Sequence, residues 1–453
     1  MSNKIVAGSH HIALYIMKLT FITALALAAT CAIPASGQSY NELRNKYKLQ
    51  DGKIITLGGE RPSQQEIDSI QTVMSHFYFD QFRHFDDPDA PYFMFMSRDA
   101  NLSMGIGGSV RIKGWYEWGG ALPINGLSPA FIPIPEDPTR KRHLGANASG
   151  TGLFFRVMGK HKKLGSYQFY IEAGFSGYMG VDFKLKKAYA QLRDFTVGLA
   201  TSTFSDPMAM APDFDASGLN TKFDETRVLV RYMPTIKDKF TVAVSAEYPK
   251  DAAVQEDAGK TEATATWMPD FAAFVQYQWT RTNHIRLAGM LRTLGYRNLL
   301  TQKNHNIVGW GVQLSAVANP SRRTTLYGTA NYGRGMTGIT NDLLASRYDL
   351  VGDAEQNPGM LYAPKSYGWS VGAQFSIKPG WFIDGSISQV RYLPKHTVAP
   401  NDYKYGMYAF ACMCYDITPR VTVAGQFTWG LRHNFDGAHK AARRFEAVAM
   451  FSF

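Results

Sequence analysis

Basic side chains recur at alternate positions in several segments, and the chemistry available to them is the attraction of anions. Arg111 and Lys113, for example, alternate with Val110 and Ile112. Such alternation predicts β-strands with bases on one face and apolar side chains on the other. The candidate bases are Arg111, Lys113, Arg156, Lys184, Lys186, Arg227, Arg231, Arg286 and Arg292. If their common face lines an aqueous channel, they form a positive wall that concentrates small anions.

The segment 205–225 supplies the opposite charge. It contains Pro207, Pro212 and Gly218, which predict irregular backbone between two strands. Its acids are Asp206, Asp213, Asp215, Asp224 and Glu225. If this connection folds into a barrel, it narrows the pore, and its acids and the basic wall set a transverse field. Two alternatives stay open: an ordinary surface loop, and pairing of some bases with Glu117, Glu172, Asp182 or Glu247.

Motifs for enzymatic or metal chemistry are scarce. The sequence has no H-E-x-x-H, G-x-S-x-G or G-x-x-x-x-G-K-[ST] pattern, so no cofactor or metal is expected. A barrel hydrolase with a Ser/His pair from different strands is still an alternative. Cys412 and Cys414 lie two apart on one predicted strand face, where a disulfide is geometrically poor.

The first 37 residues resemble an export signal. Lys18 precedes the apolar run 19–33, and the small residues 35–37 suit cleavage before Gln38. Met17 is a possible true start, and Cys31 a weaker lipoprotein alternative. The formal net charge is +11, and loss of 1–37, which hold Lys4, Lys18 and no acid, leaves +9. Export argues against nucleic acid as the partner of this basic chain.

From about residue 101 the hydrophobic pattern has a period of two. Tyr367, Trp369 and Val371, for example, alternate with small or polar residues. Aromatic residues end many of these segments, which is typical of the two interfacial girdles of a membrane barrel. The predicted strands are 102–118, 151–161, 165–176, 181–192, 195–204, 226–234, 239–248, 268–279, 284–296, 306–318, 323–335, 366–377, 381–393, 403–415, 420–432 and 441–453.

The connections between these sixteen strands alternate between short and long. Short turns such as 193–194 and 378–380 alternate with connections that include 119–150, 205–225 and 336–365. This asymmetry is typical of outer-membrane barrels, and an even strand count closes the sheet. We therefore predict an all-β, antiparallel transmembrane barrel of about sixteen strands over residues 100–453. Beyond the export signal no apolar run of roughly twenty residues occurs, which argues against membrane helices.

The last predicted strand resembles a targeting signal. Phe445, Phe451 and Phe453 lie at alternate positions, and Phe453 is the final residue. This resembles the C-terminal signature that the barrel-assembly machinery of Gram-negative bacteria reads. We expect the outer membrane as location and its lipid as surroundings.

Residues 38–99 precede the barrel and have another pattern. Arg61-Pro62-Ser63 followed by Gln64-Gln65-Glu66 predicts a helix start, and apolar residues at helical spacing extend it over about 63–85. The segment is predicted to be a short periplasmic helical part. Whether it packs, oligomerises or plugs the barrel is open.

One stretch resembles a known family. Residues 183–193 (FKLKKAYAQLR) lead through Asp194 to 195–207 (FTVGLATSTFSDP), then to 212–215 (PDFD) and the Arg-x-x-x-Arg-Tyr strand 227–232. This order is similar to that of the DcaP-like porins, in which an inward loop follows a Gly-rich strand. The resemblance covers roughly residues 181–232. It implies a homotrimeric sixteen-stranded porin with a periplasmic N-terminal helical segment and a preference for small negatively charged solutes.

The sequence thus predicts an outer-membrane channel for passive diffusion of small, preferentially anionic, hydrophilic solutes, and no enzyme. The alternative is a barrel that does not transport, such as an adhesin or a structural protein plugged by residues 38–99.

Overall fold

The computed structural model describes residues 39–57, 63, 93–97, 102–120, 125–161, 163, 165–223, 226–237, 239–255, 259–280, 282–344, 346–352, 357–395 and 398–453. The predicted signal peptide 1–37, the helix 63–85 apart from Ser63, and the acids Asp224 and Glu225 lie outside the described residues. Within the described part, no helix combines the length and apolarity needed to span a bilayer.

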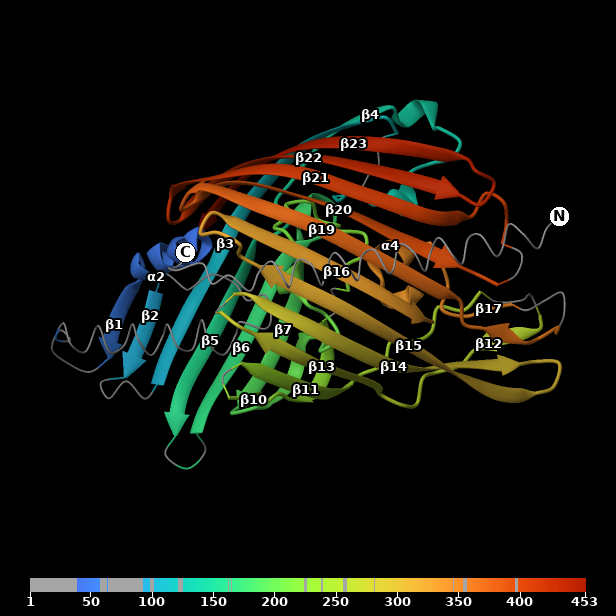
Figure 1. The fold of residues 1–453 in the computed structure, drawn as a ribbon, viewed down its shortest axis with the longest axis horizontal. Helices are drawn as coiled ribbons and strands as arrows, with labels where there is room; N and C mark the ends of the chain where they lie inside the picture. The colour runs from blue at the N-terminus through green and yellow to red at the C-terminus, as the bar shows by residue number, and fades with distance from the viewer. Residues whose placement is uncertain are drawn as a thin grey trace.

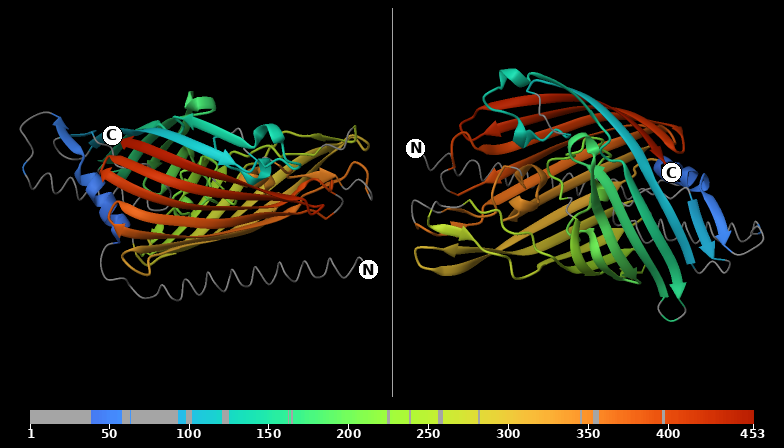
Figure 2. Two further views of the ribbon diagram at one scale, coloured as in Figure 1. Left: turned by 90° about the horizontal axis from the view of Figure 1, so that it is seen from above. Right: turned by 180° about the vertical axis from the view of Figure 1, so that it is seen from behind.

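Sixteen antiparallel strands close into a barrel (Figure 1). They are β3 (Leu102–Trp118), β5 (Gly152–His161), β6 (Gly165–Ser176), β7 (Asp182–Leu192), β8 (Phe195–Thr201), β9 (Thr226–Tyr232), β11 (Phe240–Glu247), β13 (Asp270–Gln278), β14 (His284–Asn298), β15 (Lys303–Ala318), β16 (Thr324–Arg334), β19 (Lys365–Lys378), β20 (Trp381–Leu393), β21 (Tyr403–Thr418), β22 (Val421–Asn434) and β23 (His439–Ser452). The first strand, β3, pairs with β5 on one side and with the last strand, β23, on the other, which closes the ring (Figure 2). The predicted sixteen-stranded barrel is confirmed.

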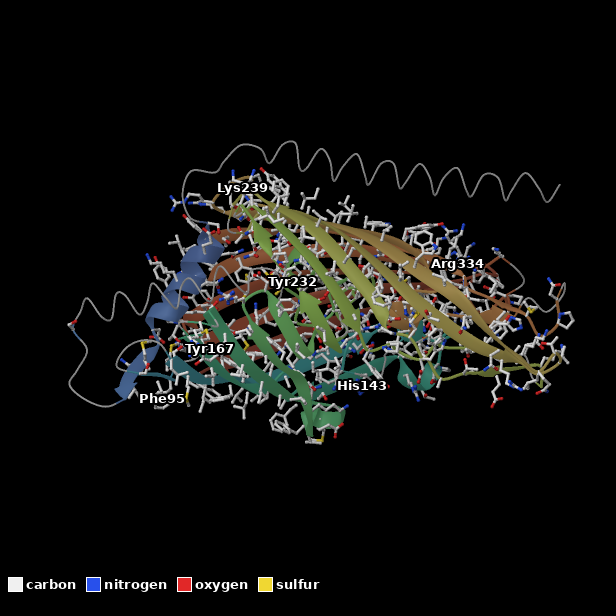
Figure 3. The ribbon with its side chains drawn as sticks, turned by 90° about the horizontal axis from the view of Figure 1, so that it is seen from below. Phe95, His143, Tyr167, Tyr232, Lys239 and Arg334 are labelled. Atoms are coloured by element: carbon white, nitrogen blue, oxygen red, sulfur yellow. The ribbon has the colours of Figure 1, made fainter. Side chains whose placement is uncertain are left out.

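The barrel exterior is apolar, as the alternation predicts. In β9, for example, Val228 and Val230 are 56% and 53% exposed, while Arg227 and Arg231 on the other face are buried. Large apolar side chains also project outward from the other strands (Figure 3). Aromatic pairs lie toward both ends of the barrel: Tyr332, which contacts Trp310, is near the end of β16, and Trp381 and Tyr415 meet at the short-turn end. An exposed apolar band flanked by aromatic rings suits hydrocarbon as its surroundings.

Short turns gather at one end of the barrel, which is also the end where the chain terminates. The long connections lie toward the other end (Figure 1). The first holds η2 (Pro129–Phe131), η3 (Pro138–Arg140) and β4 (Arg142–Asn147), and the next holds η5 (Pro207–Ala209). A later one holds η6 (Thr337–Ile339), α4 (Asn341–Leu344), β17 (Val351–Gly352) and β18 (Leu361–Tyr362). In the hairpin β14–β15, β14 ends two residues after its predicted end at 296, and β15 begins three residues before its predicted start at 306. β12 (Thr261–Ala263) pairs with the last residues of β14.

The predicted short N-terminal helical segment contains α2 (Tyr40–Gln50), which lies earlier in the chain than the helix predicted over 63–85. This helix precedes the barrel at the short-turn end and is followed by β1 (Lys53–Leu57) and β2 (Phe93–Ser97). β2 pairs with the first residues of β3. The start of α2 has a reciprocal cap: Glu42 N donates to Ser39 Oγ at 3.2 Å, and Ser39 N donates to Glu42 Oε2 at 3.0 Å. Ser-x-x-Glu is a helix-start signal that the sequence carries.

Candidate functional site: the barrel lumen

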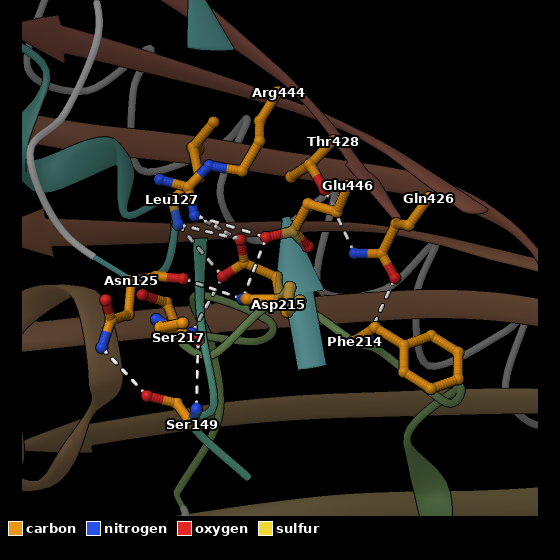
Figure 4. A network of polar contacts seen from close by, with 12 residues as sticks. Asn125, Leu127, Ser149, Phe214, Asp215, Ser217, Gln426, Thr428, Arg444 and Glu446 are labelled. Atoms are coloured by element: carbon orange, nitrogen blue, oxygen red, sulfur yellow. Dashed lines mark hydrogen bonds and ion pairs between the residues drawn. The ribbon is translucent and has the colours of Figure 1, made fainter. Parts of the chain in front are cut away.

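The connection between β8 and β9 crosses the lumen. Near its tip, Phe214 N donates to Gln426 Oε1 of β22 at 2.9 Å (Figure 4). Further along, Asn220 Nδ2 donates to Gly406 O of β21 at 3.0 Å. Because both partners belong to wall strands remote from β8 and β9 in the ring, residues 205–223 lie inside the barrel.

Two further long connections also fold inward, which the sequence did not predict. In the first, Leu127 N donates to Asp215 Oδ1 at 3.0 Å, and Ala130 N donates to Asp342 Oδ1 at 3.1 Å. From the later one, Asn341 Nδ2 donates to Ser217 O at 2.7 Å. The three connections therefore hold one another as well as the wall.

Apolar packing fixes these connections to one arc of the wall. Leu127, Ile132, Ala209, Ala211, Leu219, Val317, Tyr327, Tyr408, Phe410, Cys412 and Ala442 form one buried cluster that joins loops and strands. Glycines make room for it: a Cβ on Gly372 would lie 3.0 Å from the Ala211 Cβ, and one on Gly430 would overlap Leu127. The wall along β15, β16 and β19–β22 is therefore covered, and a second buried cluster that includes Phe204 and Phe223 covers β11, β13 and β14. Among the sixteen barrel strands, β7 is the one without a buried residue.

Three arginines among the predicted wall bases are buried in ion pairs. Arg227 Nη1 lies 2.5 Å from Asp270 Oδ2. Arg286 Nε lies 3.7 Å from Asp206 Oδ2 and Arg292 Nη1 3.1 Å from Asp349 Oδ1, on two inward connections. A buried charge is tolerated when it is paired and hydrogen-bonded. These arginines anchor structure and are shielded from a passing solute.

Four more predicted bases also have partners in the protein. Lys113 Nζ lies 3.0 Å from Glu446 Oε1, and Arg231 Nη1 donates to Thr201 O at 3.0 Å. Arg156 lies over the Tyr170 ring at 4.8 Å. The half-buried Arg111 lies 5.4 Å from the Phe214 ring centroid and donates to the Phe214 carbonyl oxygen. Arg111 thus touches the tip of the inward loop.

The remaining two predicted bases, Lys184 and Lys186, lie on β7, where no residue is buried. On β7, Phe183 and Leu185 are 60% and 55% exposed on the apolar exterior, which places Lys184 and Lys186 on the interior. Lys184 is exposed. The Lys186 side chain is 41% exposed although its Nζ lies 3.6 Å from Glu172 Oε1. Of the nine predicted bases, this pair is the part of the basic wall that water reaches most easily.

The described acids of the inward loop differ in their partners: two pair with arginines, and one accepts hydrogen bonds from uncharged side chains. Asp206 and Asp215 are buried: the first pairs with Arg286 and the second with Arg444, whose Nη1 lies 3.1 Å from Asp215 Oδ2. Asp213 accepts hydrogen bonds from Tyr408 Oη at 2.9 Å and Gln426 Nε2 at 2.6 Å. Burial and, secondly, repulsion by Asp215 raise the pKa of Asp213 to about 6.

Arg444 is the largest omission of the sequence prediction. Its guanidinium bonds to Glu117 Oε2 at 2.7 Å, lies 3.5 Å from Glu446 Oε1, and reaches Asp215 on the loop (Figure 4). The signal was present, since Arg444 alternates with the outward Phe445 and so must point inward. The wall acids Glu446 and Asp270 were missed in the same way, and the acids Asp342 and Asp349 of the later inward connection were also missed.

At the short-turn end, α2 lies against the barrel mouth. Arg44 Nε lies 2.6 Å from Asp416 Oδ2, and Asn41 Nδ2 donates to Gln374 Oε1 at 3.2 Å. Arg420 Nε donates to Asp51 Oδ2 at 2.9 Å. Because Gln374 is a buried, inward-facing wall residue, residues 39–51 line this mouth.

The described residues hold one cluster of Ser, His and Asp side chains. His284 Nε2 lies 3.0 Å from Asp206 Oδ2, and Ser315 Oγ donates to the same oxygen. Asp206 Oδ2 thus lies within hydrogen-bond distance of both side chains, the described contacts include no hydrogen bond between Ser315 and His284, and all three side chains are buried. Within the described part, no three His, Cys, Asp or Glu side chains are placed to hold a metal ion.

A closed sixteen-stranded barrel narrowed by inward connections is the architecture of porins. The outer membrane channel DcaP of Acinetobacter baumannii has this fold with a TM-score of 0.67 and 17% identity, over 79% of this chain and 99% of that chain. A loop-deletion form of OmpT of Vibrio cholerae scores 0.49 at 12% identity, over 78% of this chain and 100% of that chain. Salmonella typhi OmpF scores 0.48 at 11% identity, over 78% and 98%. The predicted resemblance to DcaP is confirmed for the fold.

No protein-family model matches the chain, and no curated protein matches it in sequence.

Proposed function

We propose that this protein is an outer-membrane porin for passive diffusion of small hydrophilic solutes, with a preference for anions. The observation that carries the proposal is the division of the lumen. Inward connections fill one arc, and the opposite arc presents Lys184 and Lys186 to water. A route lined by uncovered ammonium groups raises the local concentration of anions.

The tip of the inward loop supplies the other side of the constriction. Phe214 lies against Arg111 there and limits the opening, and Asp213 adds a negative charge near the tip. Solutes with an anionic end and a polar body would therefore orient in the field between β7 and the loop. Flow follows the concentration gradient, and no covalent step is required.

The same proposal includes the partners expected from the sequence. The apolar exterior suits outer-membrane lipid. Phe445 and Phe451 face outward from the terminal strand, where the barrel-assembly machinery could bind them. Phe453 pairs through its backbone with Gly108. Association into a homotrimer, as the DcaP-like resemblance implies, is part of the proposal.

Solute efflux from liposomes tests the proposal. Liposomes containing the purified protein would be loaded with labelled gluconate, glucose or glucosamine, which differ in charge and little in size. We expect gluconate to leave fastest and glucosamine slowest. Efflux no faster than from protein-free liposomes would identify a plugged barrel, and fastest efflux of glucosamine would overturn the anion preference.

A further inference from the structure

A set of basic side chains lies outside the barrel and has no part in the lumen. We call Arg334, Lys365, Arg391, His433, His439 and Arg443 the outer basic rim. All lie on β16, β19, β20, β22 or β23, within a few residues of the end that carries the long connections. Their neighbours along each strand are the more buried, inward-facing residues, so these six side chains face outward. Figure 3 shows Arg334 toward that end of the barrel.

Part of the rim is held in a cross-strand row. Arg391, Tyr405, His433 and His439 are successive register partners on β20, β21, β22 and β23. The Arg391 guanidinium lies 5.5 Å from the Tyr405 ring centroid. The Tyr405 and His433 rings stack at 4.6 Å, and the His433 and His439 rings at 5.6 Å. Stacking fixes these groups in place on the outer surface.

The rim lies at the level of the aromatic girdle. Arg443 is the register partner of Trp118 on one side and of Trp429 on the other. Arg334 is the partner of Trp310. Aromatic rings mark the depth of lipid headgroups, and a base at this depth can direct its charge out of the hydrocarbon.

The charge of the rim is not balanced within the protein. No outward position of β16 or of β19–β23, all fully described, carries an acid. Arg334, Lys365, Arg391 and Arg443 form no ion pair with any described residue, and Arg391 Nε is buried without a hydrogen-bond acceptor. On the opposite arc, the outward residues near the same end include Phe175, Phe183 and Tyr248.

We propose that the outer basic rim binds the phosphate groups of phosphorylated glycolipid headgroups in the outer leaflet. Phosphate offers several strong acceptor oxygens, which arginine can meet with two parallel hydrogen bonds. Bases at a membrane surface attract anionic headgroups, and an arc of several bases can hold one headgroup between strands. This lipid site is independent of solute flow, since its side chains point away from the lumen.

Native mass spectrometry of the full mature protein in detergent would test the site. The probes are bisphosphorylated lipid A, dephosphorylated lipid A and phosphatidylethanolamine. One variant carries Arg334→Gln, Lys365→Gln, Arg391→Gln and Arg443→Gln. A matched control with the same change in charge carries Lys163→Gln, Lys237→Gln, Lys239→Gln and Lys378→Gln, all at the short-turn end.

We expect the unaltered protein and the control variant to retain bisphosphorylated lipid A in preference to the other two lipids. The rim variant should bind it at least about tenfold more weakly and keep its folded-barrel mobility and its conductance. Equal binding of dephosphorylated and bisphosphorylated lipid A, or equal loss in both variants, would overturn the proposal. Loss of oligomers with unchanged lipid binding would overturn it in favour of an interface between copies of this chain.

Discussion

Neutralising Lys184 and Lys186 together perturbs the proposed pore without touching its anchors. The variant Lys184→Gln/Lys186→Gln replaces each ammonium with a neutral polar group on a slightly shorter side chain and leaves the buried arginines paired. For a permeating ion roughly 7 Å from one ammonium, the interaction in water is about 0.6 kcal/mol. Salt at about 0.1 M, with a Debye length of about 10 Å, halves it to about 0.3 kcal/mol.

Two lysines together then contribute about 0.6 kcal/mol, which enriches anions about 2.7-fold and depletes cations by about the same factor. The anion-to-cation permeability ratio should therefore fall about sevenfold in the double variant at about 0.1 M salt. At about 1 M salt the Debye length is about 3 Å, and the fall should shrink to about 1.5-fold. The assay is the reversal potential across a planar bilayer in a potassium chloride gradient.

The control for this experiment is Lys237→Gln/Lys239→Gln, which removes the same charge at the short-turn end. Its permeability ratio should stay close to that of the unaltered protein. An unchanged ratio in the Lys184/Lys186 variant, or a change that does not depend on salt, would refute the placement of these lysines in the solute route.

Other residues give further expectations. Asp215→Ala removes one of the three carboxylates around Arg444 and leaves Leu127 N without its buried acceptor, so the chain should lose about 1–3 kcal/mol of folding free energy in urea titrations and show noisier open currents; intact stability would contradict the anchor. Asp213→Asn should remove a pH dependence in which the anion preference of the unaltered channel increases as pH falls through about 6, because the carboxylate becomes neutral below its raised pKa; a persisting dependence would assign it elsewhere. Val230→Arg puts a charge on the exterior and should cost about 2–4 kcal/mol near mid-depth, whereas Val230→Leu should cost little in the same titration. Arg44→Ala should free α2, measured as faster trypsin cleavage after Lys46; unchanged cleavage would show that other contacts hold the helix.

The barrel could be predicted because the sequence of each strand shows which of its faces is apolar and which is polar. In β9, for example, the alternation of Val228 and Val230 with Arg227 and Arg231 shows which side faces lipid. This alternation can be read from one strand without knowing its neighbour. Short and long connections then fix the direction of the chain. The inward connection after β8 could be suspected from Pro207, Pro212 and its acids.

The pairing inside the lumen could not be predicted from alternation. Arg227, Arg286 and Arg292 have the same local sequence pattern as Lys184. In the structure, however, they form ion pairs with Asp270, Asp206 and Asp349, respectively, which are remote in the sequence. Whether a base is covered depends on which connections fold inward, and that depends on contacts such as Leu127 on Gly430. The basic wall was therefore predicted as one set, and the structure divides it into anchors and uncovered lysines.

The position of the N-terminal helix α2 could not be predicted from local helix preference alone. The Ser39–Glu42 cap is visible in the sequence, but α2 is short and polar. It is stabilised by contacts with Asp416 and Gln374 of the barrel wall at the short-turn end. Tertiary contacts of this kind outweigh local helix preference.

The most direct measurement is the single-channel current of the unaltered protein in a planar bilayer with potassium chloride more concentrated on one side. An open anion-selective pore predicts discrete current steps that reverse near the chloride equilibrium potential. Absence of steps would contradict an open lumen, and reversal near the potassium equilibrium potential would contradict selection by Lys184 and Lys186.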